Sequence, residues 1–298
     1  MQLNIDYFNP IEDIESMMPN KVFIELHLMF FIAYRNKDIV PKDCMSIIEE
    51  INRHTEKILL NPRYYEQLLL KPQNFRINGF AMIFYLTYCS NPILEETLKR
   101  VYPTYSNISS ELIPYRKMDL EYCLQLADRY LGRNEYEKKD LSKIAKDSIL
   151  NTNFDLLNYT YDEEYAITHS LFYLSDFGEK TIEEENIRQI SHYLLTMCFN
   201  SILTEDMDIL GEYIMNICNL NINSEICSIA FSELLKSQQE DGSFPGPNRK
   251  GFENFGKPDK NKNMSQLNKE YFMRNYHTTL VAVMASIFYM KYKRKNNE

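Results

Sequence analysis

Two kinds of hydrophobic pattern alternate along the chain. Stretches in which nearly every position is apolar cover residues 22–34, 77–89, 163–174, 206–218 and 271–292. Stretches that are apolar on one side only cover residues 43–58, 119–131, 140–150, 183–200 and 224–239. Both kinds predict helices, and residues 92–101 predict a short helix of mixed pattern. A helix that is apolar on all sides must be buried, and an amphipathic helix can cover it.

The alternation predicts an all-α fold in which inner helices are covered by outer ones. The simplest such architecture is an α/α toroid, here incomplete or irregular, in which a double layer of helices surrounds an axis. An irregular helical bundle is the alternative. A chain of 298 residues can bury a large core without disulfides or metals. We therefore expect residues 1–298 to form a single toroid domain.

Composition excludes several classes of protein. Only 8 residues are glycine, which disfavours β-rich folds and nucleotide-binding glycine loops, and no G-x-S-x-G, Walker or G-x-G-x-x-G motif occurs. The formal net charge of −9 disfavours a nucleic-acid partner. The start of the chain does not resemble a signal peptide, and no apolar run is long enough to span a membrane. We expect a cytoplasmic protein with reduced thiols, and the abundance of Asn, Ile, Lys and Tyr suggests a bacterial source.

One segment departs from the helical pattern. Residues 241–269 hold four of the eight glycines together with many Lys and Asn residues. A loop of this length is unusual in a compact domain and is often functional. We expect residues 241–269 to form a lid or a binding loop, with a surface insertion as the alternative. Elsewhere in the chain, the predicted helix over 119–131 should end at Gly132, because glycine is suited to a helix C-cap.

Two segments in the C-terminal third carry a family resemblance. Residues 237–247 read SQQEDGSFPGP, and residues 275–286 read NYHTTLVAVMAS. The first is similar to the Q-x-x-D-G-S-F/W repeat of terpene cyclases and protein prenyltransferase β subunits, in which an outer helix ends before a glycine turn and an aromatic residue. The second is similar to the Y-H-T segment that opens an inner helix of the prenyltransferase β subunits. The resemblance implies the α/α-toroid fold and makes His277 a zinc ligand.

The chain departs from that family at the other zinc ligands. The family has an Asp and a Cys in a D-G-C-Y-like stretch, and the corresponding residues here are Leu210 and Glu212. The D-x-D-D acid motif of polyene cyclisation is also absent from the sequence. The resemblance therefore implies the fold more strongly than it implies prenyl transfer.

An internal alignment of the apolar helices places four chemistry-bearing residues at one level. ELHLMFFIA, ITHSLFYLS, LGEYIMNIC and NYHTTLVAV carry His27, His169, Glu212 and His277 at their third positions. In a toroid, such positions face a shared cavity. Imidazole and carboxylate ligands suit Zn²⁺ or Fe²⁺, so we predict that His169, Glu212 and His277 bind a divalent metal. Histidines that are simply bonded within the core are the alternative.

Further residues are candidates for a catalytic role around this metal. His27 is a fourth ligand or an acid–base group, Tyr165 lies four residues before His169, and Asp176 lies seven residues after it. Asp206 and Asp208 open the helix that carries Glu212, and we expect both to cap its N-terminus and to offset its dipole.

The leading functional prediction is a metal-dependent hydrolase, lyase or non-heme oxygenase. Its substrate would be a small organic molecule or a modified peptide, bound in a central helical cavity, in bacterial specialised metabolism. An isoprenoid transferase or terpenoid cyclase is the second candidate, and its diphosphate would need Arg249, Lys250 and Arg274. A non-catalytic binding or scaffold protein is the third.

Overall fold

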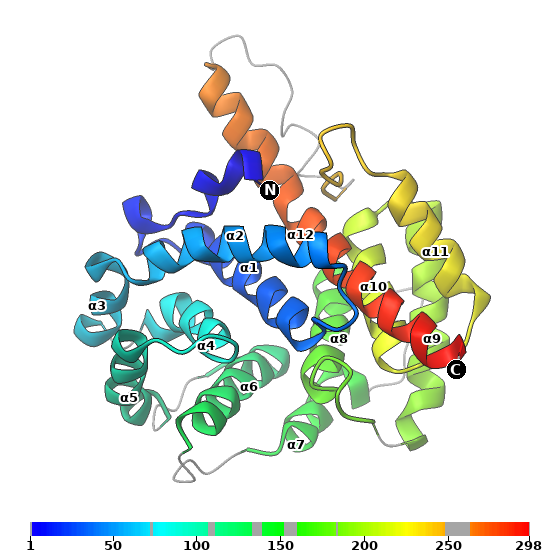
Figure 1. Cartoon of the computed structure of the whole chain (residues 1–298). Helices are drawn as coiled ribbons and strands as arrows, with labels where there is room; N and C mark the ends of the chain where they lie inside the picture. Colours follow the sequence, from blue (N-terminus) through cyan, green and yellow to red (C-terminus); the bar gives the residue numbers. More distant parts are fainter. Residues whose placement is uncertain are drawn as a thin grey trace. The chain divides into compact units, whose positions relative to one another are not determined.

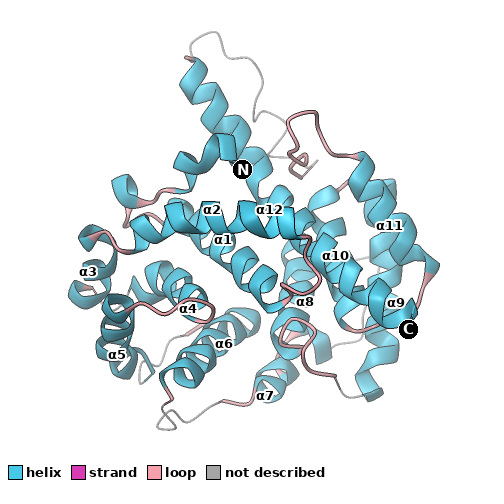
Figure 2. Cartoon of the chain, viewed as in Figure 1, coloured by secondary structure: helices cyan, strands magenta, loops and turns pink. Residues whose placement is uncertain are grey.

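The computed structural model describes residues 2–71, 74–106, 111–132, 139–151, 160–182, 184–247 and 263–297. These residues form helices joined by turns and loops, with no strand among them (Figure 1 and Figure 2). The prediction of an all-α protein is thus confirmed. The chain divides into two compact units, Met1–Asp147 and Ser148–Glu298, which we call unit 1 and unit 2. A single toroid domain stays a prediction.

Unit 1 is built around two apolar helices. Its α-helices are α1 (Met17–Arg35), α2 (Lys42–Leu59), α3 (Pro62–Leu70), α4 (Phe80–Leu86), α5 (Pro92–Ser106), α6 (Pro114–Leu131) and α7 (Leu141–Lys146). Short 3₁₀ segments η1 (Gln2–Phe8) and η2 (Ile11–Asp13) precede them, and the π-helical turn η4 (Phe75–Gly79) leads into α4. Helices α1 and α4 pack together, and every residue of α4 is buried.

Unit 2 has a central helix that its neighbours enclose. Its elements are η5 (Ile149–Asn151), α8 (Tyr161–Leu174), α9 (Glu184–Leu203), α10 (Met207–Asn219), α11 (Glu225–Lys236) and α12 (Met264–Asn297). Helix α10 packs against α8, α9, α11 and α12, and every residue from Met207 to Cys218 is buried. The all-round apolar pattern predicted from the sequence therefore corresponds to a helix surrounded by others.

Helix α12 approaches α10 closely at a glycine. A Cβ atom at position 211 would lie 2.5 Å from Val281 Cγ1, a distance shorter than any normal carbon contact. Gly211 thus lets α12 pack against the α10 backbone at the turn that carries Glu212.

Two helices differ from the sequence-based expectation. Helix α3 was not predicted, although Asn61 caps it through a bond from the Arg63 N–H and Pro62 occupies its first turn. Helix α12 begins at Met264, so the C-terminal part of the predicted loop over 241–269 is helical. Residues 248–262 of that loop lie outside the described residues. The C-cap at Gly132 is confirmed, with φ of 61°.

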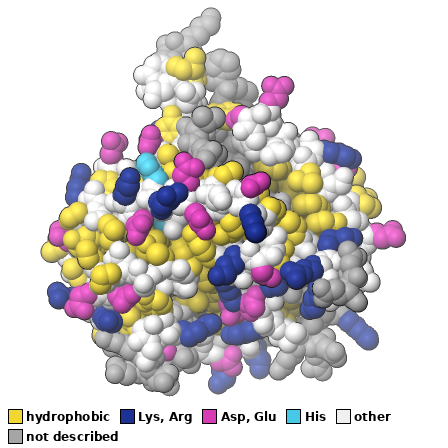
Figure 3. Space-filling view, in the orientation of Figure 1, with side chains coloured by type: hydrophobic (Ala, Val, Ile, Leu, Met, Phe, Trp, Pro, Cys, Tyr) yellow, Lys and Arg dark blue, Asp and Glu magenta, His cyan; other side chains and the backbone are white. Residues whose placement is uncertain are grey.

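A helix that crosses a bilayer must be both long and apolar. None of the described helices combines the necessary length with the necessary apolarity. On the face drawn in Figure 3, side chains of both charge signs are interspersed with hydrophobic ones.

Candidate functional site

Helix α10 places two buried carboxylates one turn apart. Asp208 and Glu212 are separated by four residues, so both lie on the same face of the helix. Their side chains are 1% and 2% exposed, respectively. Two like charges at this spacing repel each other, and buried charges are costly unless they are paired or hydrogen-bonded. The residues that face them from α8 and α12 therefore define the chemistry of the site.

Hydroxyl groups from both neighbouring helices donate to these carboxylates. Thr168 Oγ1 on α8 donates to Glu212 Oε2, and Thr278 Oγ1 on α12 donates to Asp208 Oδ1 at 2.6 Å. Tyr165 on α8 donates its phenolic proton to Asp208 Oδ2, and Tyr161 donates to the Tyr165 oxygen. The hydroxyl groups thus hold each carboxylate in one orientation.

His169 approaches the Glu212 carboxylate from α8. Its Nδ1 lies 3.5 Å from Glu212 Oε2 and donates a hydrogen bond of 2.9 Å to the Tyr165 carbonyl oxygen. Because a carbonyl only accepts, Nδ1 carries the proton in the neutral ring. Nε2 is then the basic nitrogen of His169, the atom that can take up a proton or ligate a metal.

His277 approaches both carboxylates from α12. Its Nε2 atom lies 3.7 Å from Glu212 Oε1 and 3.8 Å from Asp208 Oδ1. Both separations exceed the 2.7–3.2 Å range of a hydrogen bond of this type. The structure thus brings His169, Glu212 and His277 together, as their alignment from the sequence anticipated, and adds Asp208.

The carboxylates of the cluster are more deeply buried than its imidazoles. The imidazoles of His169 and His277 are 25% and 19% exposed, whereas the carboxylates behind them are almost fully buried. The imidazoles are therefore the part of the cluster that is in contact with solvent.

Tyr165 remains protonated in this environment. Burial, and then the negative charges of Asp208 and Glu212, raise its pKa well above the ordinary value, because a phenolate would be a third negative charge in the same place. The Tyr165 hydroxyl therefore keeps its proton at neutral pH and acts as a hydrogen-bond donor. Its predicted place near the site agrees with its bond to Asp208.

The donor atoms are more widely spaced than in a bound metal site. Among the described residues, no group of three or more His, Cys, Asp or Glu side chains forms a ready-made metal site. In a tetrahedral site with bonds of 2.0–2.2 Å, neighbouring donor atoms are about 3.4 Å apart. The separations of His277 Nε2 from its two carboxylates exceed this by a few tenths of an ångström.

His27 has a different environment. It belongs to unit 1, where it is fully buried, and Phe23 and Phe30 contact its ring edge to face at centroid distances of 4.6 and 5.5 Å. Its Nδ1 lies 3.2 Å from the Tyr88 hydroxyl oxygen. Burial lowers its pKa to about 3, so His27 is neutral at physiological pH. These contacts are those of a core histidine. Its complete burial and low pKa argue against the predicted acid–base role.

Asp176 and Asp206 lie at the ends of helices. Asp176 is in the turn after α8, with φ of 48° and seven residues beyond His169, or about 10 Å along a helix axis. The structure therefore does not bring Asp176 to the carboxylates. Asp206 caps α10 by accepting from the Ile209 N–H, as expected.

Asp208 was expected to cap α10 and to offset its dipole. It lies in the first turn of α10, where its charge suits the dipole, but the capping residue is Asp206. The Asp208 carboxylate accepts hydrogen bonds from Tyr165 and Thr278. The signal that could have identified it is its four-residue spacing from Glu212, which puts both carboxylates on one helical face.

The two segments of family resemblance lie against each other in unit 2. Residues after α11 form a tight turn in which Gly242 has φ of 82°, and the buried Phe244 donates its N–H to Thr279 on α12. His277 lies thirteen residues beyond the start of α12, whereas the Y-H-T segment that it resembles opens a helix. Of the residues considered for a diphosphate, Arg274 is on α12, whereas Arg249 and Lys250 lie outside the described residues.

The sequence matches the model of one known protein family. Residues 2–287 match the model of a family described as Domain of unknown function (DUF6895), and the chain belongs to that family. No curated protein and no solved structure matches it.

Proposed function

We propose that this protein is a metal-dependent enzyme whose active site is the cluster formed by Asp208, Glu212, His169 and His277. The observation that carries the proposal is the position of Glu212, whose carboxylate lies within 3.7 Å of one nitrogen from each histidine. The substrate class is a small organic molecule or a modified peptide that reaches the exposed edge of the histidines.

The charge of the cluster favours a divalent cation. Two carboxylates that are 1% and 2% exposed lie beside two imidazoles, and a divalent cation between them would compensate buried negative charge. Carboxylate and imidazole donors together suit Zn²⁺ and Fe²⁺. The hydrogen bonds from Thr168 and Thr278 are of the kind that orients ligating carboxylates from behind.

The geometry favours Asp208, Glu212 and His277 as the ligands. His277 Nε2 faces an oxygen of each carboxylate, whereas His169 faces Glu212 with its protonated Nδ1. We therefore place His169 beside the ion as a base that uses Nε2. The sequence-based set of His169, Glu212 and His277 is the alternative.

Each group then has a defined task. A divalent cation held here would supply Lewis-acid activation of a substrate oxygen. His169 would take up a proton at Nε2, and Tyr165 would keep its phenolic proton, because its pKa is raised, and would orient Asp208 by its hydrogen bond.

The packing of unit 2 supports the toroid as its architecture. In this proposal α8, α10 and α12 are inner helices, and α9 and α11 are outer helices. Helices α9 and α11 pack on α10 and on each other, and they carry exposed apolar side chains such as Phe199 and Ile229.

Metal binding by the purified protein tests the proposal. The protein is stripped with a chelator, dialysed, and titrated by calorimetry with Zn²⁺, and with Fe²⁺ in the absence of air. We expect one equivalent to bind, and Glu212→Gln, Asp208→Asn and His277→Ala each to weaken binding at least about 100-fold. His169→Ala should retain the metal if it is a base and lose it if it is a ligand.

The control is His192→Ala. His192 is exposed on α9 in the same unit, so its loss should leave both affinity and stoichiometry unchanged. The proposal fails if neither metal binds, or if metal binding survives in both Glu212→Gln and His277→Ala while circular dichroism shows an intact helical fold.

A further inference from the structure

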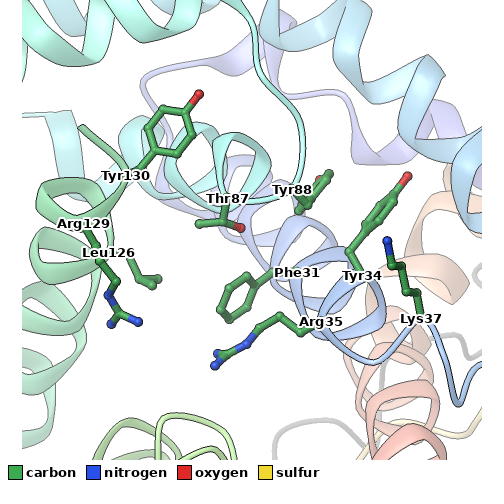
Figure 4. A pocket seen from close by; sticks show the side chains of 9 residues that line it. All are labelled: Phe31, Tyr34, Arg35, Lys37, Thr87, Tyr88, Leu126, Arg129 and Tyr130. Carbon is green, nitrogen blue, oxygen red and sulfur yellow. The ribbon is translucent and has the colours of Figure 1, made fainter. Parts of the chain in front are cut away.

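A pocket in unit 1 combines aromatic walls with positive charge. It has a volume of about 440 Å³ and lies where the C-terminal ends of α1, α4 and α6 come together (Figure 4). The residues that line it are Phe31, Tyr34, Arg35, Lys37, Thr87, Tyr88, Leu126, Arg129 and Tyr130. The volume falls within the range of small-molecule sites.

The charge of this pocket is opposite to that of the chain. Three of the nine described lining residues are cationic and none is acidic, although the protein as a whole has a formal charge of −9. Figure 4 shows Arg35 and Arg129 pointing to the same side of the pocket, toward the lower part of the view. Clustered cations with low-dielectric walls concentrate an anion.

Arg35 is held in place before any ligand arrives. Its guanidinium carbon lies 4.8 Å from the centroid of the Phe31 ring, a cation–π contact. The contact restricts where the guanidinium group can lie, and a planar guanidinium matches two oxygens of one anion. The side chain of Arg129 is exposed at the end of α6, so it can reach the same anion.

The aromatic wall is also fixed. The rings of Tyr34 and Tyr88 stack with centroids 4.3 Å apart and planes 6° from parallel. The Tyr88 hydroxyl donates to Asn52 Oδ1 at 3.0 Å and accepts from His27 Nδ1 at 3.2 Å. A wall that is already ordered costs little entropy when a ligand packs against it.

We propose that this pocket binds an aromatic phosphate monoester of the size of a nucleoside monophosphate. The phosphate would lie between Arg35 and Arg129, and the aromatic ring would pack against Phe31, Leu126 and the tyrosines. A phosphate monoester carries nearly two negative charges at neutral pH, so two guanidinium groups favour it over a monoanionic carboxylate. The site lies in unit 1 and is independent of the metal cluster on α10.

The test is calorimetric titration with adenosine monophosphate in the presence of EDTA, which keeps metal out of unit 2. We expect binding with a stoichiometry of one. Adenosine and inorganic phosphate, each of which lacks half of the recognised groups, should bind at least about tenfold more weakly.

Variants locate the ligand. Arg129→Gln should weaken binding of adenosine monophosphate about tenfold, and Arg35→Gln at least as much. Arg100→Gln is the matched control, because Arg100 is on α5 of the same unit and pairs with Glu96, and it should change the affinity less than twofold. Since Arg129 is exposed, its replacement should leave the melting temperature unchanged.

Three outcomes would overturn the proposal. One is that adenosine monophosphate does not bind at millimolar concentration. Another is that adenosine binds equally well, since the cations would then play no part. The last is that Arg129→Gln and Arg35→Gln both bind with the affinity of the original protein.

Discussion

Gly211 of α10 lies directly against Val281 of α12, and a methyl group at position 211 would stand 2.5 Å from the Val281 Cγ1 atom. This close approach sets the distance between the helix that carries Asp208 and Glu212 and the helix that carries His277. The packing of the Val281 side chain against the Gly211 backbone therefore controls the geometry of the cluster.

Replacing this glycine should affect both stability and the site. We expect Gly211→Ala to destabilise the protein by about 1–3 kcal/mol, because the short Val281 side chain cannot move away without displacing α12. Urea unfolding measures the change. The double variant Gly211→Ala, Val281→Ala should lose less stability than the sum of the two single variants, since the second change removes the atom that clashes. Additive effects would contradict the interpretation.

The two threonines provide a finer test of the metal cluster. If a divalent ion binds, Thr168→Val and Thr278→Val should each lower its affinity about 10- to 100-fold, because the carboxylates lose the groups that orient them. Calorimetric titration with Zn²⁺ measures this. Thr196→Val on α9 is the control, since Thr196 bonds to the His192 carbonyl within its own helix. Unchanged affinity in both variants would show that these hydroxyls do not support ligands.

Acid should destabilise the protein partly through His27. Burial lowers its pKa from 6.5 to about 3, so between these values the unfolded chain binds a proton that the folded chain does not. Stability contributed by neutral His27 is complete above pH 6.5 and falls as the pH drops, by up to about 1.4 kcal/mol per unit. In His27→Leu this component should disappear from unfolding curves recorded between pH 7 and 4.

The control for this prediction is His192→Leu, because His192 is exposed. Its pH dependence should match that of the original protein. If His27→Leu also keeps the original slope, the proton uptake arises from other groups and the role assigned to His27 is wrong.

Thiol labelling should separate one cysteine from the rest. Cys44 is exposed, Cys89 is partly buried, and the other four cysteines are buried. Burial raises the pKa of Cys123 and Cys198, which lowers the fraction of reactive thiolate. We expect one thiol to react rapidly with Ellman's reagent in the folded protein, and Cys44→Ser to abolish that phase. Several fast thiols in Cys44→Ser would contradict the burial pattern.

Most helices were predictable because a buried helix requires apolar residues at most of its positions, and this pattern is visible in the sequence. The run over 206–218 could only belong to an enclosed helix, and α10 is enclosed. Helix α3 was missed because its apolar face is narrow, with Tyr64 and Leu68 as its buried residues. Whether the helices form a toroid depends on packing angles, which hydrophobic periodicity does not encode.

The site was predictable in part for a similar reason. Histidines and a carboxylate within apolar helices are expensive to bury, so they stand out, and His169, Glu212 and His277 were identified in this way. His27 has the same local pattern, and only its aromatic neighbours distinguish it. The role of Asp208 was hidden because an aspartate at a helix start is equally suited to capping.

Helix α10 has a consequence for how the sequence can change over time. The same thirteen residues supply the centre of the unit 2 core and the carboxylates of the cluster. In a saturation mutagenesis experiment, nearly every position of α10 should therefore be intolerant, and abundance and activity should fall together. On α8 and α12 the partly exposed His169 and His277 should stand apart, as positions where activity is lost while the protein still accumulates.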